Sequence, residues 1–210
     1  MFVGPSLPPA QVEALLPGAS ILPPVQLGDL LRVGARAGDR ILMIDGLFLQ
    51  SAPVRHKEIL ALLAEGVTVI GSSSMGALRA AELHQYGMRG VGEVFELYRD
   101  GVIDGDDEVA VIHTSADEGY RALSEPLVSI RVAIGEAARD GAVTADTAAA
   151  LLRIAKALPF RLRSRRMLVQ CARQELASEA VDRFGRLVRP PCPRSQGGRS
   201  GRHADLGGQR

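Results

Sequence analysis

Lysine is nearly absent from this chain. Only Lys57 and Lys156 are lysines among the 25 basic residues, so arginine supplies almost all of the positive charge. Arginine keeps its proton in a protein, whereas a lysine in a dry pocket can become neutral and accept a proton from a hydroxyl. We therefore expect lysine at a position where arginine would not serve, such as a site that needs a base.

Cysteine, long apolar runs and net charge are scarce as well. The 210 residues include 2 cysteines, Cys171 and Cys192, and the formal net charge is +1. Two such cysteines make neither a disulfide framework nor a zinc site. No apolar run approaches the ~18 residues of a membrane span, the first residues lack a signal-peptide pattern, and the charge gives no nucleic-acid or membrane signal. These absences predict a cytoplasmic protein that uses no metal or cofactor and binds neither nucleic acid nor membrane.

Apolar β-branched runs alternate with helical patterns in the first 125 residues. This alternation is typical of an α/β fold with a mostly parallel sheet. The expected strands lie at 1–3, 40–44, 67–70 and 109–112, and the expected helices near 10–16, 55–64, 75–85 and 91–99.

The pattern becomes helical after Pro126. We expect helices near 127–139, 145–157 and 163–184, with Thr144 as the N-cap of the second. Residues 189–210 are rich in Pro, Gly, Ser and Arg and have no apolar period, which predicts a disordered tail. The expected organisation is one domain over 1–188, made of an α/β core (1–125) and a helical part (126–188), followed by that tail.

A serine-rich turn lies between the expected strand 67–70 and the helix near 75–85. The turn resembles a Gly-x-Ser-x-Gly nucleophile elbow, with Ser72 in place of the first glycine and Ser74 at the nucleophile position. The N–H groups of Met75 and Gly76 would lie at a helix N-terminus and could stabilise an oxyanion. Two other interpretations stay open: Ser73 or Ser74 caps the helix, or the turn binds an anion without chemistry.

A serine nucleophile needs a base, and Lys57, His56 and His113 are available. Lys57 and His56 open the helix near 55–64, which precedes the strand before the serine turn. For Lys57 to act, its pKa must fall from about 10.4 toward about 7 to 8, through burial or a nearby positive charge such as Arg55. His113 follows the expected strand 109–112 and could face the same edge of the sheet as Ser74.

Two further polar residues, Ser6 and Asp45, directly follow expected strands. The carboxyl edge of a parallel sheet is where α/β proteins build their sites, although Asp45 is equally well explained as a turn former. The acidic run Asp104–Glu108 lacks the glycine and terminal glutamate spacing of a calcium loop. We expect this run to be a solvated acidic turn.

Several longer blocks of the sequence resemble the TfuA-like protein family. The resemblance covers roughly residues 1–135. The blocks that carry it are Gly4–Leu7, Asp45–Phe48, Val54–Leu60, Ser73–Leu83, Gly87–Gly92 and Asp106–Ala110.

The resemblance implies a partner of YcaO-type enzymes in peptide backbone thioamidation, a modification of ribosomally made peptides. It further implies a Ser-Lys hydrolase that releases sulfide from a thiocarboxylated ubiquitin-like sulfur carrier protein, with Ser74 and Lys57 as the catalytic pair. Whether Ser73 or Ser74 is the nucleophile stays open, and a non-catalytic adaptor that docks a YcaO enzyme onto its peptide is the alternative. The residues expected to form the oxyanion site or to support the pair are Ser73, Met75, Gly76, His56, Asp45, Ser6 and His113.

A hydrolase of this kind must admit the flexible C-terminal tail of the carrier. Such tails are recognised through backbone contacts and a few charged residues. Arg55, Arg79 and Arg89 fall near the expected mouth of the site. We therefore expect an arginine-lined entrance that accepts the negative terminus of the carrier.

Overall fold

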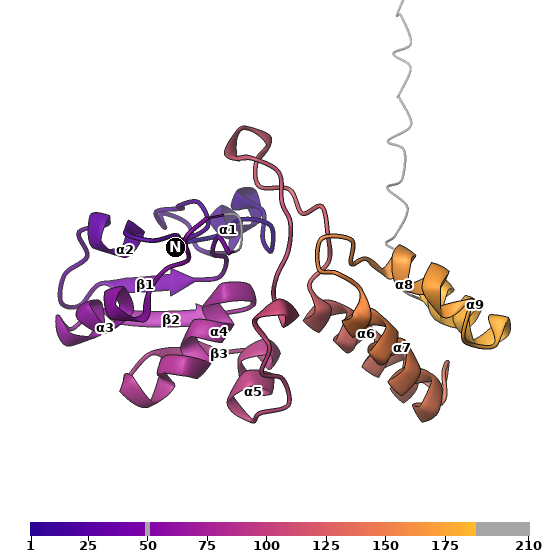
Figure 1. The fold of residues 1–210 in the computed structure, drawn as a ribbon. Helices are drawn as coiled ribbons and strands as arrows, with labels where there is room; N and C mark the ends of the chain where they lie inside the picture. The colour runs from indigo at the N-terminus through magenta and orange to yellow at the C-terminus, as the bar shows by residue number, and fades with distance from the viewer. Residues whose placement is uncertain (49–50, 188–210) are drawn as a thin grey trace, which may run out of the picture.

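The computed structural model describes residues 1–48 and 51–187. Figure 1 shows an α/β core beside a separate stack of helices, with the segment after α5 looping between them. The core holds a three-stranded parallel sheet in the order β1-β2-β3. The expected fold class, a parallel α/β core followed by a helical part, is confirmed.

The elements alternate in the core and are purely helical afterwards. The strands are β1 (Arg40–Met43), β2 (Thr68–Ser72) and β3 (Arg89–Val91). The core helices are α1 (Pro9–Leu15), α2 (Asp29–Arg32), α3 (His56–Ala64), α4 (Ser74–Leu83) and α5 (Glu93–Arg99). The short 3-10 helices are η1 (His84–Tyr86), η2 (Asp106–Glu108) and η3 (Ala116–Glu118), and the helical unit consists of α6 (Leu127–Arg139), α7 (Ala145–Ala157), α8 (Arg165–Ala172) and α9 (Ser178–Leu187).

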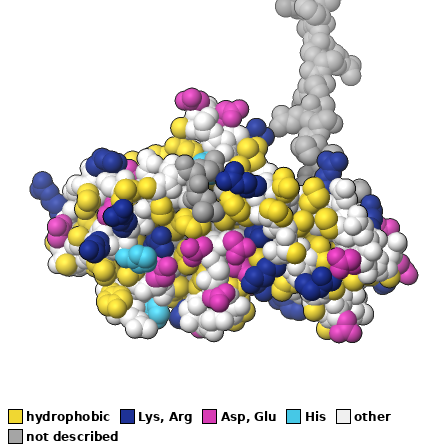
Figure 2. Space-filling view, in the orientation of Figure 1, with side chains coloured by type: hydrophobic (Ala, Val, Ile, Leu, Met, Phe, Trp, Pro, Cys, Tyr) yellow, Lys and Arg dark blue, Asp and Glu magenta, His cyan; other side chains and the backbone are white. Residues whose placement is uncertain are grey.

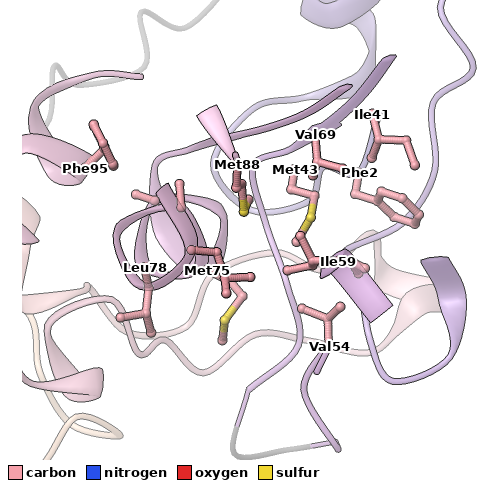
Figure 3. Close-up of a cluster of buried hydrophobic side chains, with 14 of the residues drawn as sticks. Phe2, Ile41, Met43, Val54, Ile59, Val69, Met75, Leu78, Met88 and Phe95 are labelled. Atoms are coloured by element: carbon pink, nitrogen blue, oxygen red, sulfur yellow. The ribbon is translucent and has the colours of Figure 1, made fainter. Parts of the chain in front are cut away.

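Apolar residues from the strands meet the helices in one buried layer. In the register of the sheet Ile41 lies beside Val69, and both are buried. Figure 3 shows Met43 and Ile59 in the same cluster, between the strands and the flanking helices. This packing holds the carboxyl ends of β1 and β2 next to the first turn of α4.

Two of the four expected strands belong to the sheet, and the other two do not. Phe2 makes only isolated parallel bridges, to Met43 and Leu22. The apolar run 109–112 forms no strand. Val109 is buried in the hydrophobic cluster of the α/β core, and the chain pairs back on itself through an antiparallel bridge from His113 to Ala122. The strand β3 was not expected, because its Arg-Gly-Val sequence is short and contains no apolar run.

The helical unit has a hydrophobic core of its own. Thr144 caps α7 as expected, since its hydroxyl accepts a hydrogen bond of 3.2 Å from the Thr147 amide. The expected helix 163–184 is instead two helices, α8 and α9, which pack on each other. A single straight helix would separate Leu168 from Phe184 by roughly 24 Å. The break lets both side chains enter the same core, where each is fully buried.

The acidic run forms a junction between the core and the helical unit. Glu108 is 1% exposed and accepts hydrogen bonds from the Arg131 guanidinium, one of them 2.5 Å long. Asp107 accepts from buried Arg163 through both its carbonyl (2.8 Å) and its carboxylate (2.9 Å). The expectation of a solvated turn is therefore wrong for Glu108, because the arginine that pairs with it lies far along the sequence, whereas the Asp107 side chain keeps 42% of its surface exposed.

Within the described ranges, no helix combines the length and the apolar character needed to cross a membrane. Cys171 is a free thiol on α8. The expected tail 189–210, including Cys192, lies outside the residues that the structure describes.

Candidate functional site

The serine turn joins β2 to α4 through two residues with positive φ. Ser73 has φ 54° and ψ −179°, and Ser74 has φ 23°. The conformation of Ser73 belongs to a region that is almost reserved for glycine and that costs of order 1–3 kcal/mol. Side chains held in this way project sharply from a strand end, as the nucleophile elbow requires. Such strain persists where the surrounding structure holds the turn, and it is concentrated at functional sites.

Glycines hold the turn in this conformation by permitting close backbone contact. A Cβ atom at Gly71 would overlap the carbonyl oxygen of Gly76, and one at Gly76 would overlap the carbonyl oxygen of Met43. The first turn of α4 therefore lies directly on the ends of β1 and β2. These contacts explain why glycine occupies positions 71 and 76.

The turn does not use its serine hydroxyls to cap the helix. Ser73 occupies the N-cap position of α4, but its side chain makes no capping hydrogen bond. Its carbonyl accepts from the Ala77 amide at 2.6 Å, which closes the first turn of the helix. Both Ser73 and Ser74 are half-buried. The capping interpretation is thereby weakened, and the nucleophile and anion-binding interpretations stay open.

A small pocket opens beside Ser74. It is shallow, because the ≈ 260 Å³ of empty space in it includes open solvent at its mouth. Three segments meet around it: the loop after β1, the start of α4 and the segment after η2. The lining residues are Gly46, Phe48, Ser74, Met75, Val109, Val111 and His113. The structure thus brings together Ser74, His113 and Met75 among the expected site residues, with Gly46, Phe48, Val109 and Val111 added.

His113 reaches this pocket from the segment between the two units. Its Nδ1 lies 2.7 Å from the Thr114 carbonyl oxygen, and its ring packs edge-on against Tyr120 with 5.6 Å between the ring centres. Because a carbonyl only accepts, this contact places the proton on Nδ1. A neutral His113 then has its basic nitrogen at Nε2, the form that a general base needs.

Lys57 and His56 lie at the start of α3, beside the far end of α4. His56 Nε2 contacts the Glu82 carboxylate at 2.8 Å, and Glu82 is eight residues beyond Ser74, roughly 12 Å along the helix. Lys57 is exposed. In the described ranges its ammonium forms no ion pair or hydrogen bond. The structure therefore does not place Lys57 in the pocket that Ser74 lines.

The three arginines expected at the entrance have different surroundings. Arg79 is 8% exposed and is engaged on α4, where it donates to the Val54 carbonyl at 3.2 Å and to Glu82 at 2.6 Å. It therefore fastens the chain before α3 to α4. Arg55 and Arg89 are exposed, at the start of α3 and of β3.

Asp45 and Ser6 do meet at the carboxyl edge of the sheet. The buried Asp45 carboxylate accepts from the amides of Gly4 (2.8 Å) and Ser6 (3.0 Å) and from the Ser6 hydroxyl (2.6 Å). With three donors on one carboxylate, Asp45 fixes the loop after Val3 in place. This arrangement is more than a turn former would provide, and it braces the loop next to the pocket.

No group of three or more His, Cys, Asp or Glu side chains that could hold a metal ion occurs in residues 1–48 and 51–187. The pocket residues that sequence reasoning missed are apolar or glycine. Phe48 and Gly46 belong to the Asp45–Phe48 block, which was the only sequence signal that could have indicated them.

The comparison with known families gives one match. The sequence profile described as "TfuA-like protein" matches residues 45–164, which include the serine turn, both pocket-lining loops and the start of the helical unit. No curated protein sequence matches the chain.

Proposed function

Because the chain belongs to the TfuA-like protein family, we propose that it works with a YcaO-type enzyme in peptide backbone thioamidation. In this proposal the chain is a hydrolase that releases sulfide from a ubiquitin-like sulfur carrier protein with a C-terminal thiocarboxylate. The carrier protein and the enzyme are its partners. The released sulfide is the sulfur source for the thioamide.

The observation that carries the proposal is the strained serine turn. Ser73 has a positive φ, its side chain makes no capping hydrogen bond, and the neighbouring Ser74 lines a pocket at the N-terminus of α4. A nucleophile at a helix N-terminus has backbone N–H donors and a favourable dipole for the negative charge of a tetrahedral intermediate. Met75 lines the pocket in the first turn of α4, and its amide is the proposed oxyanion donor. The Gly76 amide, which the sequence suggested as a second donor, is instead bonded to the Ile44 carbonyl at 3.1 Å.

The proposed reaction has two steps. The serine oxygen forms a bond to the thiocarboxylate carbon, the C–S bond breaks, and the sulfur leaves as hydrosulfide with the proton that the base took from the serine. Water then hydrolyses the acyl ester, which returns the serine and leaves a carboxylate on the carrier. Splitting the reaction in this way is the usual advantage of covalent catalysis.

Two residues compete for the role of base. Lys57 is the partner that the family resemblance implies, and its action requires that its exposed side chain reach the turn or that the carrier bury it on binding. His113 already lines the pocket with Ser74, and its Nδ1 contact favours a basic Nε2. We propose the Ser-Lys mechanism as the first candidate and Ser74 with His113 as the second, because of this pocket.

The test is sulfide release by the purified chain alone. A carrier thiocarboxylated at its C-terminus is incubated with the chain, and both free sulfide and the intact mass of the carrier are followed. Conversion of thiocarboxylate to carboxylate at the rate of sulfide release supports the proposal. Release no faster than in a control without the chain contradicts it.

The alternative, a non-catalytic adaptor, makes a different prediction in the same assay. An adaptor would leave the thiocarboxylate intact and would still increase the turnover of the YcaO-type enzyme when sulfide is supplied directly. A hydrolase would make the added sulfide unnecessary.

A further inference from the structure

The charge of this chain is divided between its two units, although the net charge is close to zero. Residues 1–126 contain 17 acidic and 9 basic side chains, whereas residues 127–187 contain 6 acidic and 11 basic ones. On the face in Figure 2, Lys and Arg side chains lie over the helical unit and its junction with the core, and others lie on the far side of the core. An acidic core and a basic helical unit present different surfaces to a partner.

The basic charge is densest in the loop between α7 and α8. Residues 160–166 have the sequence Phe-Arg-Leu-Arg-Ser-Arg-Arg. Two of the four arginines have internal roles, because Arg163 binds Asp107 and Arg165 forms an ion pair of 2.9 Å with Glu125. Arg161 and Arg166 are exposed, and neither has a carboxylate partner within the described residues. These two guanidinium groups are available for binding.

Exposed apolar side chains lie in this loop and in the segment bonded to it. Leu162 is 61% exposed, and Leu123, in the segment that bonds to this loop through Glu125, is 56% exposed. Arg161 lies over the ring of Phe160, 5.4 Å from its centre. Arginine and aromatic residues are enriched among the side chains that dominate protein interfaces. We call Phe160, Arg161, Leu162, Arg166 and Leu123 the basic loop patch.

Hydrogen bonds of the buried Arg163 and of Glu125 fix the loop that carries the patch. Arg163 is 2% exposed and donates to the Asp107 carbonyl and carboxylate and to the Leu158 carbonyl at 3.1 Å. The Glu125 amide donates to the Arg163 carbonyl at 2.8 Å. A loop fixed in this way loses little conformational freedom on binding, which favours affinity.

We propose that the basic loop patch is the docking surface for the YcaO-type enzyme, through an acidic face of that enzyme with an apolar centre. This inference rests on the proposed function. A nucleic acid would engage many aligned cations, whereas two free arginines around exposed leucines suit a protein surface that is desolvated on contact. The position of the patch also suits this partner. Asp107 connects the loop to the segment whose Val109 and Val111 line the pocket. The bound enzyme would stand close to the sulfide as it leaves.

The test is calorimetric titration of the full chain with the YcaO-type enzyme. The variant Arg161→Glu/Arg166→Glu reverses the two free charges, and Leu162→Ser removes the apolar contact. The control Arg36→Glu/Arg139→Glu makes the same change in charge at two exposed arginines elsewhere. We expect the patch variants to raise Kd at least about tenfold and the control to leave it within a factor of about two. Added salt should weaken wild-type binding more than binding by the charge-reversed variant.

Sulfide release by the same variants separates this inference from the proposed function. The patch variants should release sulfide from the carrier at the wild-type rate, because none of the altered residues lines the pocket. Equal binding of enzyme by wild type and patch variants would overturn the docking surface and leave the hydrolase proposal intact. If wild type itself does not bind the enzyme, both the proposed partnership with the YcaO-type enzyme and the proposed docking surface are contradicted. If the patch variants lose binding to a single-stranded RNA probe but still bind the enzyme as tightly as wild type, the patch binds nucleic acid and the inference is overturned.

Discussion

The Gly76 amide donates a hydrogen bond of 3.1 Å to the Ile44 carbonyl, which ties the first turn of α4 to the chain that leaves β1. This bond requires contact so close that a Cβ atom at Gly76 would overlap the Met43 carbonyl oxygen. Neither backbone can move without displacing the buried ends of the strands. The serine turn is therefore held by the sheet beneath it.

Gly76→Ala should destabilise the protein by at least about 2 kcal/mol, because overpacking against fixed backbone is costly. The matched control is Gly135→Ala in α6, where an added Cβ meets nothing within 4 Å. That control should stabilise the protein by about 0.5–1 kcal/mol through helix propensity. Urea unfolding of both variants measures the difference. Equal effects would mean that the contact with Met43 does not constrain the turn.

Ser73→Ala and Ser74→Ala should separate the two serine assignments. Loss of a nucleophile costs several orders of magnitude in rate, whereas loss of a neighbouring hydroxyl costs far less. We expect Ser74→Ala to abolish sulfide release with the fold intact, because Ser74 lines the pocket. Rates of the two variants, compared at equal stability, are the measurement. If Ser74→Ala keeps more than about a tenth of wild-type turnover while Ser73→Ala does not, the strained Ser73 is the nucleophile.

The base can be identified from Lys57→Arg, Lys57→Ala and His113→Gln. If Lys57 is the base, Arg should be as damaging as Ala, because arginine keeps the charge but accepts no proton. If His113 is the base, both Lys57 variants should retain near-normal turnover and His113→Gln should lose at least about a hundredfold. Steady-state sulfide release decides between them. Full activity in all three variants would exclude both residues.

Removing Glu108 from its pair with Arg131 should destabilise the junction between the two units. Breaking a buried ion pair from one side leaves an unpaired charge and costs about 3–5 kcal/mol. We expect Glu108→Gln to show a cost of this order in chemical denaturation. Glu136→Gln, at an exposed position of α6, is the control and should change the free energy of unfolding by under about 0.5 kcal/mol. A similarly small effect for Glu108→Gln would show that the pair does not stabilise the junction.

Tyr98 should make stability decline in alkaline solution. Its phenol is largely buried and donates to the Gly105 carbonyl at 2.9 Å, and burial, assisted by nearby carboxylates such as Glu108, raises its pKa well above the usual value. Below about pH 10 Tyr98 is neutral in both the folded and the unfolded chain, so its contribution to stability is fully present there. Above that pH the unfolded chain loses the phenol proton first, and the free energy of unfolding falls.

Denaturation between pH 9 and 11 measures this effect. Tyr98→Phe should flatten the decline, whereas Tyr86→Phe, at a ring that is 66% exposed, should keep it. An unchanged slope in Tyr98→Phe would assign the alkaline loss of stability to other groups.

Local sequence patterns were sufficient to predict most individual elements. The apolar run before Ile44 and the β-branched run before Gly71 predicted β1 and β2, and apolar periodicity predicted α3 to α7, because these signals arise from residues that are neighbours in the chain. The strand–turn–helix layout of the serine turn was equally local. Asp45 and Ser6 could be placed at one edge because both follow the ends of parallel elements.

Only the tertiary structure decided which of the expected site residues meet. Lys57 was the expected base and His113 a supporting residue. In the structure the pairing of His56 with Glu82 places the start of α3 at the far end of α4, whereas His113 lines the pocket. The acidic run and the 109–112 segment were misread for the same reason. The partners of the acidic run, Arg131 and Arg163, lie tens of residues away, and Val109 is buried in the hydrophobic cluster of the α/β core. Burial by such distant contacts leaves no periodic signal in the sequence.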